Sequence, residues 1–245
     1  MAQVRRDRLK RLMTGMPNGT PVDTADLAAA GVSTDLAAYY VRHGWLERLA
    51  HGVYVRAGDT LSLHATLVFL QRRLVALRVG GKSALDWHGI RHYVAQRATL
   101  QLYGWNSAQL PTWFTARFPA HYRRQRLFDE TPDSPLYAGP FEARGDAPRV
   151  SSPERAFLEM LGEVGTRQSL SEATELAESL YTLRAKVMSE LLRHCTSVKT
   201  RDLALRLGLT LNLPWFAKLA PEVLALDRRH EAQAPRRRAR ATRGA

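Results

Sequence analysis

Glycines divide residues 24–56 into short segments, and their positions constrain the fold more than any other feature of the chain. Gly31 and Gly44 each end a stretch of mainly small and apolar residues that begins with an aspartate, serine or threonine. Those three residue types cap the N-termini of helices, and glycine readily adopts the left-handed conformation that ends them. We therefore expect two short helices joined by a glycine turn. The candidate caps are Asp23 or Thr24 for the first helix and Ser33 or Thr34 for the second.

The sequence on either side of these helices completes a recognisable order of elements. Upstream, "RRDRLKRLM" places apolar residues on one face of a helix and arginines on the other. Downstream, "WLERL" and "VYVR" flank the turn "AHG", where Gly52 supplies the positive φ of a tight hairpin. Residues 1–57 are thus predicted to form a winged helix-turn-helix. In that fold the third helix enters the DNA major groove and the hairpin, or wing, lies beside it.

Helical periodicity then selects candidate DNA-binding residues. Leu36 and Tyr40 are expected to face the first two helices. The short side chains of Thr34, Ala37 and Ala38 are then expected to face outward, where they allow close approach to base edges. Arg42 would reach a guanine or a phosphate, and basic residues near the hairpin would contact phosphates. A helical module that docks protein remains the alternative. The candidates are Ser33, Thr34, Ala37, Ala38, Arg42, Arg48, His51 and Arg56.

The charge of the chain favours a polyanionic partner. The 245 residues carry a formal net charge of +13, and arginines are concentrated at both ends. A net positive charge of this size suits binding to double-stranded DNA, although a solubilising surface with a basic tail would give the same net charge. Residues 229–245 contain no core residue and are predicted to be disordered.

Other features of composition exclude several classes of protein. No apolar run approaches the roughly 18 residues of a membrane span, and no apolar segment follows the basic N-terminus as in a secretory signal. Cys195 is the single cysteine, so an internal disulfide is impossible and a reducing cytoplasm is expected.

Residues 58–228 are predicted to form a larger α+β domain, with strands first and helices after. "ATLQLYGW", "RLFDE", "LYAGPFEAR" and "PRVSS" are typical of strands. Ser83, with Asp86 three residues later, is expected to cap a short helix, and Ser152 followed by Pro153 is a strong helix start. "SLSEATELAESL", "RAKVMSELLRHC" and "RDLALRLG" continue the helical half.

Two motifs resemble ligand sites but lack a required residue. "GGKS" at residues 80–83 has the end of a phosphate-binding loop, yet the position that needs the first glycine holds Ala76. His88 and His92 have the spacing of zinc ligands, yet Gly89 stands where a metalloprotease has glutamate. A structural turn and no metal site are therefore expected.

The remaining chemistry also argues against catalysis. Asp129, Glu130 and Asp133 cluster in a predicted turn without the lysine that a magnesium-dependent nuclease usually has nearby. We expect no enzyme and no cofactor. Basic and aromatic residues alternate at 91–97 and 121–128, which would suit either a nucleic-acid grip or core aromatics beneath a solvated basic face.

As a whole, the chain resembles the AbiEi family, the antitoxins of abortive-infection systems classed as type IV toxin–antitoxin pairs. The resemblance spans about residues 20–225. It rests on "TADLAAAGVSTDLAAYYVRHGWLERLAHGVYV", "GGKSALDWHGIRHYV", "LQLYG", "LPTWF", "VSSPERAFLEML" and "TLRAKVMSELLRHCTSVKTRDLALRL".

The resemblance implies a winged helix that binds inverted repeats in its own promoter and a larger domain that counters a nucleotidyltransferase toxin, without a stable complex between the two proteins. The residues by themselves indicate DNA binding but not antitoxin activity. A stand-alone regulator with a sensor domain, or an RNA-binding protein, would account for the same residues.

Overall fold

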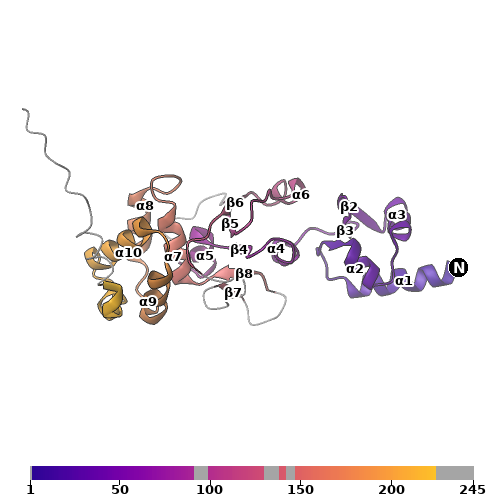
Figure 1. The fold of residues 1–245 in the computed structure, drawn as a ribbon. Coiled ribbons are helices and arrows are strands. Elements are labelled where there is room, and N and C mark those ends of the chain that lie inside the picture. The colour runs from indigo at the N-terminus through magenta and orange to yellow at the C-terminus, as the bar shows by residue number, and fades with distance from the viewer. Residues whose placement is uncertain (1, 91–98, 130–137, 142–146, 225–245) are drawn as a thin grey trace, which may run out of the picture.

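Figure 1 shows the computed structural model as an elongated molecule. A small unit of helices and short strands lies at one end, a five-stranded sheet occupies the middle, and helices α7 to α10 gather at the other end. The predicted tail at 229–245 lies outside the described residues, as do His92, Glu130, Asp133 and the basic stretch at 91–97. The structure describes residues 2–90, 99–129, 138–141 and 147–224.

The N-terminal unit has the element order of a winged helix, as predicted. Its sheet is antiparallel with strand order β1-β3-β2, so the hairpin is joined by a third strand that the sequence did not reveal. That strand has only two residues, too few for any alternation to be detected. The elements are α1 (Ala2–Gly15), β1 (Val22–Asp23), α2 (Thr24–Ala29), α3 (Thr34–Arg42), β2 (Leu46–Ala50) and β3 (Val53–Arg56).

Side-chain caps begin the helices of this unit where the sequence places them. Asp23 accepts the backbone N–H of Asp26 at 2.8 Å, and the Asp26 carboxylate accepts the N–H of Asp23 at 3.0 Å, which forms a capping box at the start of α2. Ser33 accepts the N–H of Leu36 at 3.3 Å at the start of α3. Of the paired alternatives, Asp23 and Ser33 are therefore the caps.

Two glycines set the direction of the chain after α3. Gly44, directly beyond the helix, has a φ of 71°, and Gly52 in the hairpin turn has a φ of 70°. A residue with a Cβ would be strained by about 1–2 kcal/mol in this region. Between these breaks, Leu27, Tyr40 and Leu46 are each 1% exposed and form the centre of a small core shared by the helices and the sheet.

The second sheet combines parallel and antiparallel pairs in the order β6-β5-β4-β8-β7. β4 is parallel to β8 and β5 is parallel to β6, whereas the β4–β5 and β7–β8 pairs are antiparallel. The strands are β4 (Arg78–Val79), β5 (Leu100–Gly104), β6 (Ala120–Arg124), β7 (Ala138–Pro140) and β8 (Arg149–Ser151).

Helix α7 is the centre of the larger core. It contacts α5, α8, α9, α10 and β8, and Phe157, Leu158 and Leu161 are fully buried there. It begins as predicted, with Ser152 accepting the N–H of Arg155 at 3.3 Å. The helices are α4 (Leu63–Gln71), α5 (Gly81–Trp87), α6 (Thr112–Thr115), α7 (Pro153–Gly162), α8 (Leu170–Glu178), α9 (Ala185–His194), α10 (Val198–Thr210) and the 3₁₀ turn η1 (Phe216–Lys218).

The prediction that Ser83 caps a helix is wrong. The N-terminal cap of α5 is Gly80, three residues before Ser83, and it makes no side-chain hydrogen bond. Ser83 instead lies in the first turn, and its hydroxyl accepts the backbone N–H of Gln101 at 2.9 Å. Ser83 therefore ties α5 to strand β5 instead of capping the start of the helix.

One prediction of a strand also needs correction, and one short helix was not predicted. The described part of "RLFDE", residues 126–129, does not form a strand; Phe128 makes only an isolated bridge with Cys195, and its side chain belongs to the core. The strand in this region is β6, which covers part of the basic stretch at 121–128. Helix α6 was likewise not predicted; it has a single turn and no side-chain cap.

Candidate nucleic-acid interface

Helix α3 presents one exposed and one buried face. Thr34, Ala38 and Arg42 are solvent-exposed, and the Ser33 hydroxyl caps the end of the helix from which they project. Tyr40 is 1% exposed and belongs to the small core. The exposed face thus carries two short side chains and one cation, and the carboxylate of Asp35 in the first turn is exposed beside them. The short side chains and Arg42 can lie close to a polyanion, whereas Asp35 opposes one.

The placement of Ala37 on this outward face is wrong. Ala37 is 1% exposed and packs in the core beside Tyr40. The two residues are three positions apart, and residues at that spacing share one face of a helix. Leu36, four positions before Tyr40, is half-buried against the same core. Ala37 therefore allows close packing beneath the helix and does not face a groove.

The wing brings Arg48 and His51 together in solvent. The Arg48 Nη2 atom lies 2.9 Å from His51 Nδ1, and its Nε donates to the carbonyl of Ala50 at 3.2 Å. Because a guanidinium only donates, the imidazole Nδ1 must accept, which leaves the proton on Nε2. The wing tip thus holds an exposed guanidinium and an imidazole N–H, both suited to phosphate oxygens.

Arg56 does not belong to this surface, so its prediction as a phosphate contact is wrong. Its guanidinium donates to the Asn18 Oδ1 at 2.7 Å, to the carbonyl of Met16 at 2.6 Å and to the carbonyl of Met13. Met13 lies in the last turn of α1, where carbonyl groups lack helical partners and attract cations. Arg56 thus fastens the end of α1 to the sheet.

Two ion pairs that the sequence analysis missed join the winged helix to the second domain. Arg72 donates to both carboxylate oxygens of Asp26, at 2.8 and 2.9 Å, and Arg73 pairs with Asp23. The hydrogen bond from Arg72 lowers the pKa of the Asp26 carboxyl, although partial burial opposes the shift. The partners lie 46 and 50 positions apart, so no local pattern could have indicated them.

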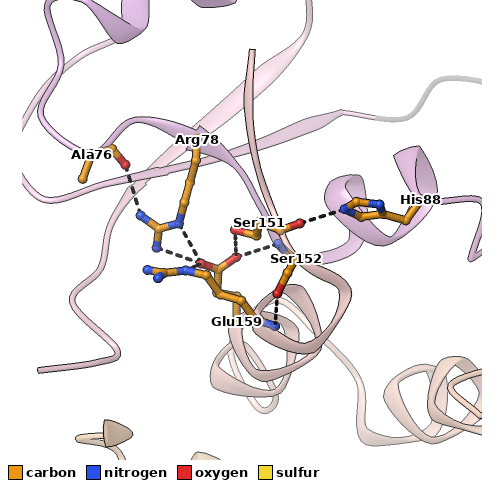
Figure 2. A network of polar contacts seen from close by, with 8 residues as sticks. Ala76, Arg78, His88, Ser151, Ser152 and Glu159 are labelled. Carbon is orange, nitrogen blue, oxygen red and sulfur yellow. Dashed lines mark hydrogen bonds and ion pairs between the residues drawn. The ribbon is translucent and has the colours of Figure 1, made fainter. Parts of the chain in front are cut away.

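A second candidate site, around Glu159 in the larger domain, is occupied by the protein's own side chains. Figure 2 shows the carboxylate of Glu159 facing Arg78 and Ser151. Arg78 and Arg155 each donate an Nε–H to Glu159 Oε1 at 2.8 Å, and the Ser151 hydroxyl donates to Oε2 at 2.9 Å. Glu159 is fully buried. Desolvation works to raise its pKa, but the two guanidinium groups outweigh it and hold the pKa of this carboxyl below its ordinary value.

The "GGKS" segment contributes to the same network. The backbone N–H of Gly81 donates to Glu159 Oε2 at 3.1 Å, and that of Lys82 donates to the Gln101 Oε1 at 2.8 Å. The protein's own side chains therefore occupy the donors that a phosphate-binding loop would offer to a ligand. A Cβ on Gly80 would lie 2.3 Å from the carboxylate, which explains the glycine there.

The other described residues that the sequence suggested for metal binding or catalysis, His88 and Asp129, make polar contacts within the protein. The His88 Nε2 donates to the carbonyl of Ser151 at 3.0 Å, a hydrogen bond that is drawn in Figure 2. Asp129 pairs with His194 at 2.7 Å. Among the described residues, no three histidine, cysteine or acidic side chains form a group able to hold a metal ion. Nor does any helix in the described part of the chain have the length and apolarity to cross a membrane.

The basic stretch at 121–128 uses some of its charge internally. Arg123 pairs with Glu163, and the guanidinium of Arg126 lies 4.6 Å from the centroid of the Trp105 ring. His121 and Arg124 are solvent-exposed. A nucleic-acid grip in this region remains a prediction.

Comparison with known proteins identifies the family. A model described as the N-terminal domain of the transcriptional regulator AbiEi antitoxin matches residues 5–96, and a model described as the transcriptional regulator AbiEi antitoxin of a type IV TA system matches residues 97–232. No curated protein sequence matches.

The fold is also found in a solved structure. The crystal structure of the RV2827C protein from Mycobacterium tuberculosis superposes with a TM-score of 0.55 at 16% identity, covering 87% of this chain and 82% of that chain. At this identity the likeness concerns the fold alone, whereas the two family models cover almost the whole chain. The chain belongs to the AbiEi family of antitoxins and transcriptional regulators of type IV toxin–antitoxin systems.

Proposed function

We propose that this protein represses its own operon by binding inverted repeats through the winged helix. It would also counter a nucleotidyltransferase toxin encoded beside it, and both activities would take place in the cytoplasm. Residues 1–57 would form the DNA-binding unit and residues 58–228 the antitoxin unit. Membership of the AbiEi family supports both halves of the proposal. The separate core between Leu12 and Tyr54 supports the division.

The exposed face of α3 is the observation that carries the DNA-binding half. Ser33, Thr34 and Ala38 are short enough for the helix to enter the major groove, and Arg42 would then reach a guanine edge or a phosphate. Arg48 and His51 would contact phosphates along the wing. Ala37 and Arg56 are left out, since the core and the end of α1 occupy them.

The antitoxin half is proposed for the second domain without a stable toxin complex. The buried charges around Glu159 hold α5, α7 and the sheet together, so we place no chemistry in that network. Antitoxin activity would then depend on the outer surface of this domain or on the target of the toxin.

Fluorescence anisotropy with the promoter repeats and with a scrambled duplex tests the DNA-binding half. We expect the double variant Thr34→Ala, Arg42→Ala to lose about 1–3 kcal/mol of discrimination between the two duplexes. Arg193→Ala, which removes an exposed arginine from α9, is the matched control and should bind as the wild type does. Unchanged discrimination by the double variant would remove α3 from the reading role.

Growth of cells that express the neighbouring nucleotidyltransferase gene tests the antitoxin half with the same variants. The full chain should restore growth, and the double variant should restore it equally when both are expressed from an unrelated promoter. If the wild-type chain fails to rescue, the antitoxin half is wrong and the alternative, a stand-alone regulator, is favoured.

A further inference from the structure

A cleft of about 410 Å³ lies between the winged helix and the second domain. One wall comes from α1, the loop after it and α2, and the other comes from α4. This volume lies within the range of small-molecule sites, which occur preferentially where two domains meet. The cleft is separate from the exposed face of α3 and from the network of Glu159.

The two walls belong to different hydrophobic cores. Leu12, Met16 and Leu27 are part of the small N-terminal core, whereas Phe69 is part of the larger one. Val68, beside Phe69, is half-buried and also lines the cleft. The cleft therefore marks a place where two apolar surfaces face each other without merging, and an apolar molecule placed there would contact both.

The charged residues of the cleft favour an anion. Three line it: Arg11, which is solvent-exposed, Arg72 and Asp26. Asp26 holds the guanidinium of Arg72 in place through two hydrogen bonds, so the balance of the lining is one excess positive charge. A carboxylate is a small anionic group whose geometry matches the donor fork of an arginine side chain.

We propose that this cleft binds a small apolar organic acid, with its apolar body between the two cores and its carboxylate at the arginine-bearing rim. Such a ligand contacts the winged helix and α4 at once, so its binding strengthens the docking of the two domains. This property is independent of DNA binding and of antitoxin activity.

Isothermal titration calorimetry of the full chain tests the proposal with a matched pair of probes, 1-naphthoate and 1-naphthylmethylammonium. We expect naphthoate to bind at least about tenfold more tightly than the amine, which corresponds to about 1.4 kcal/mol. No binding of naphthoate, or equal or tighter binding of the amine, overturns the proposal.

Variants then locate the site. Ala30→Trp and Ala65→Trp fill the cleft from its two walls and should each lower naphthoate affinity at least about tenfold. Ala28→Trp adds the same ring to an exposed position of α2 that does not line the cleft, and it should leave the affinity unchanged. Wild-type affinity in both filling variants overturns the location.

The role of the rim has its own test. Arg11→Gln removes one positive charge from an exposed position and should weaken naphthoate binding severalfold while leaving the amine unaffected or bound more tightly. Unchanged naphthoate affinity in this variant overturns the recognition of the carboxylate by the rim.

Discussion

The arginines of the winged helix and those of the second domain illustrate two opposite uses of the same side chain. Arg42 and Arg48 are solvent-exposed on α3 and the wing, whereas Arg78 and Arg155 are each 2% exposed and enclose one carboxylate. An exposed guanidinium can exchange water for a phosphate, but a buried one must keep its counter-charge. The net charge of +13 adds both kinds together, so it overstates the charge available to a polyanion.

The largest effect expected from this comparison concerns Glu159. Glu159→Gln leaves two buried guanidinium groups without their shared counter-charge and should lower the free energy of unfolding by about 3–5 kcal/mol. Urea denaturation measures the loss. The matched control is Glu47→Gln, at an exposed position of β2, where a change within about 0.5 kcal/mol is expected. A similar small change for Glu159→Gln would contradict the assignment of the network as a structural centre.

A second, smaller effect is expected at Arg56. Arg56→Ala leaves the carbonyl groups of Met13 and Met16 without their donor and should reduce the free energy of unfolding by about 1.5–3 kcal/mol. The salt dependence of DNA binding, measured by anisotropy at several salt concentrations, should stay as in the wild type. A flatter salt dependence with unchanged stability would return Arg56 to the phosphate-contacting residues.

Arg48 provides the opposite case within the same hairpin. Arg48→Ala should leave stability within about 0.5 kcal/mol of the wild type, because its partners Ala50 and His51 lie in solvent-accessible positions. It should reduce the slope of log affinity against log salt concentration by about 0.9, the contribution of one phosphate contact. Binding should weaken on all duplexes alike; a loss confined to the promoter repeats would mean that Arg48 reads sequence.

These contrasts show which parts of the molecule local sequence could predict. Asp23, Ser33 and Ser152 begin their helices because a capping side chain acts on backbone groups two or three residues away. Gly44 and Gly52 act on their own φ angles. Signals of this range are visible in a single sequence, and they were enough to predict the winged helix and the α+β class.

Interactions between distant residues account for the errors in the candidate site. Arg56 donates to the carbonyl groups of Met13 and Met16, which lie 43 and 40 positions upstream in the sequence. Arg78 meets Glu159 across 81 positions. Nothing local distinguishes these arginines from Arg42 or Arg48, because exposure is decided by how the elements pack. The error at Ala37 was different, since its spacing from Tyr40 already indicated a shared buried face.

The smallest effect is a pH dependence at the ion pair that joins the two domains. The hydrogen bond from Arg72 lowers the pKa of Asp26 in the folded protein, so the folded state binds fewer protons than the unfolded chain in the acid range. The resulting stabilisation is complete above the unfolded pKa, near pH 4, and is lost as the pH falls through the folded value. With the Arg72 side chain 52% exposed, this stabilisation should amount to less than about 1 kcal/mol.

Asp26→Asn keeps an acceptor for the capping box but abolishes the titration. Unfolding free energies of the two proteins should therefore differ at pH 7 and converge as the pH falls through the lowered pKa of Asp26. A difference that stays constant throughout the acid range would show that the cap, not the charge of the ion pair, causes it.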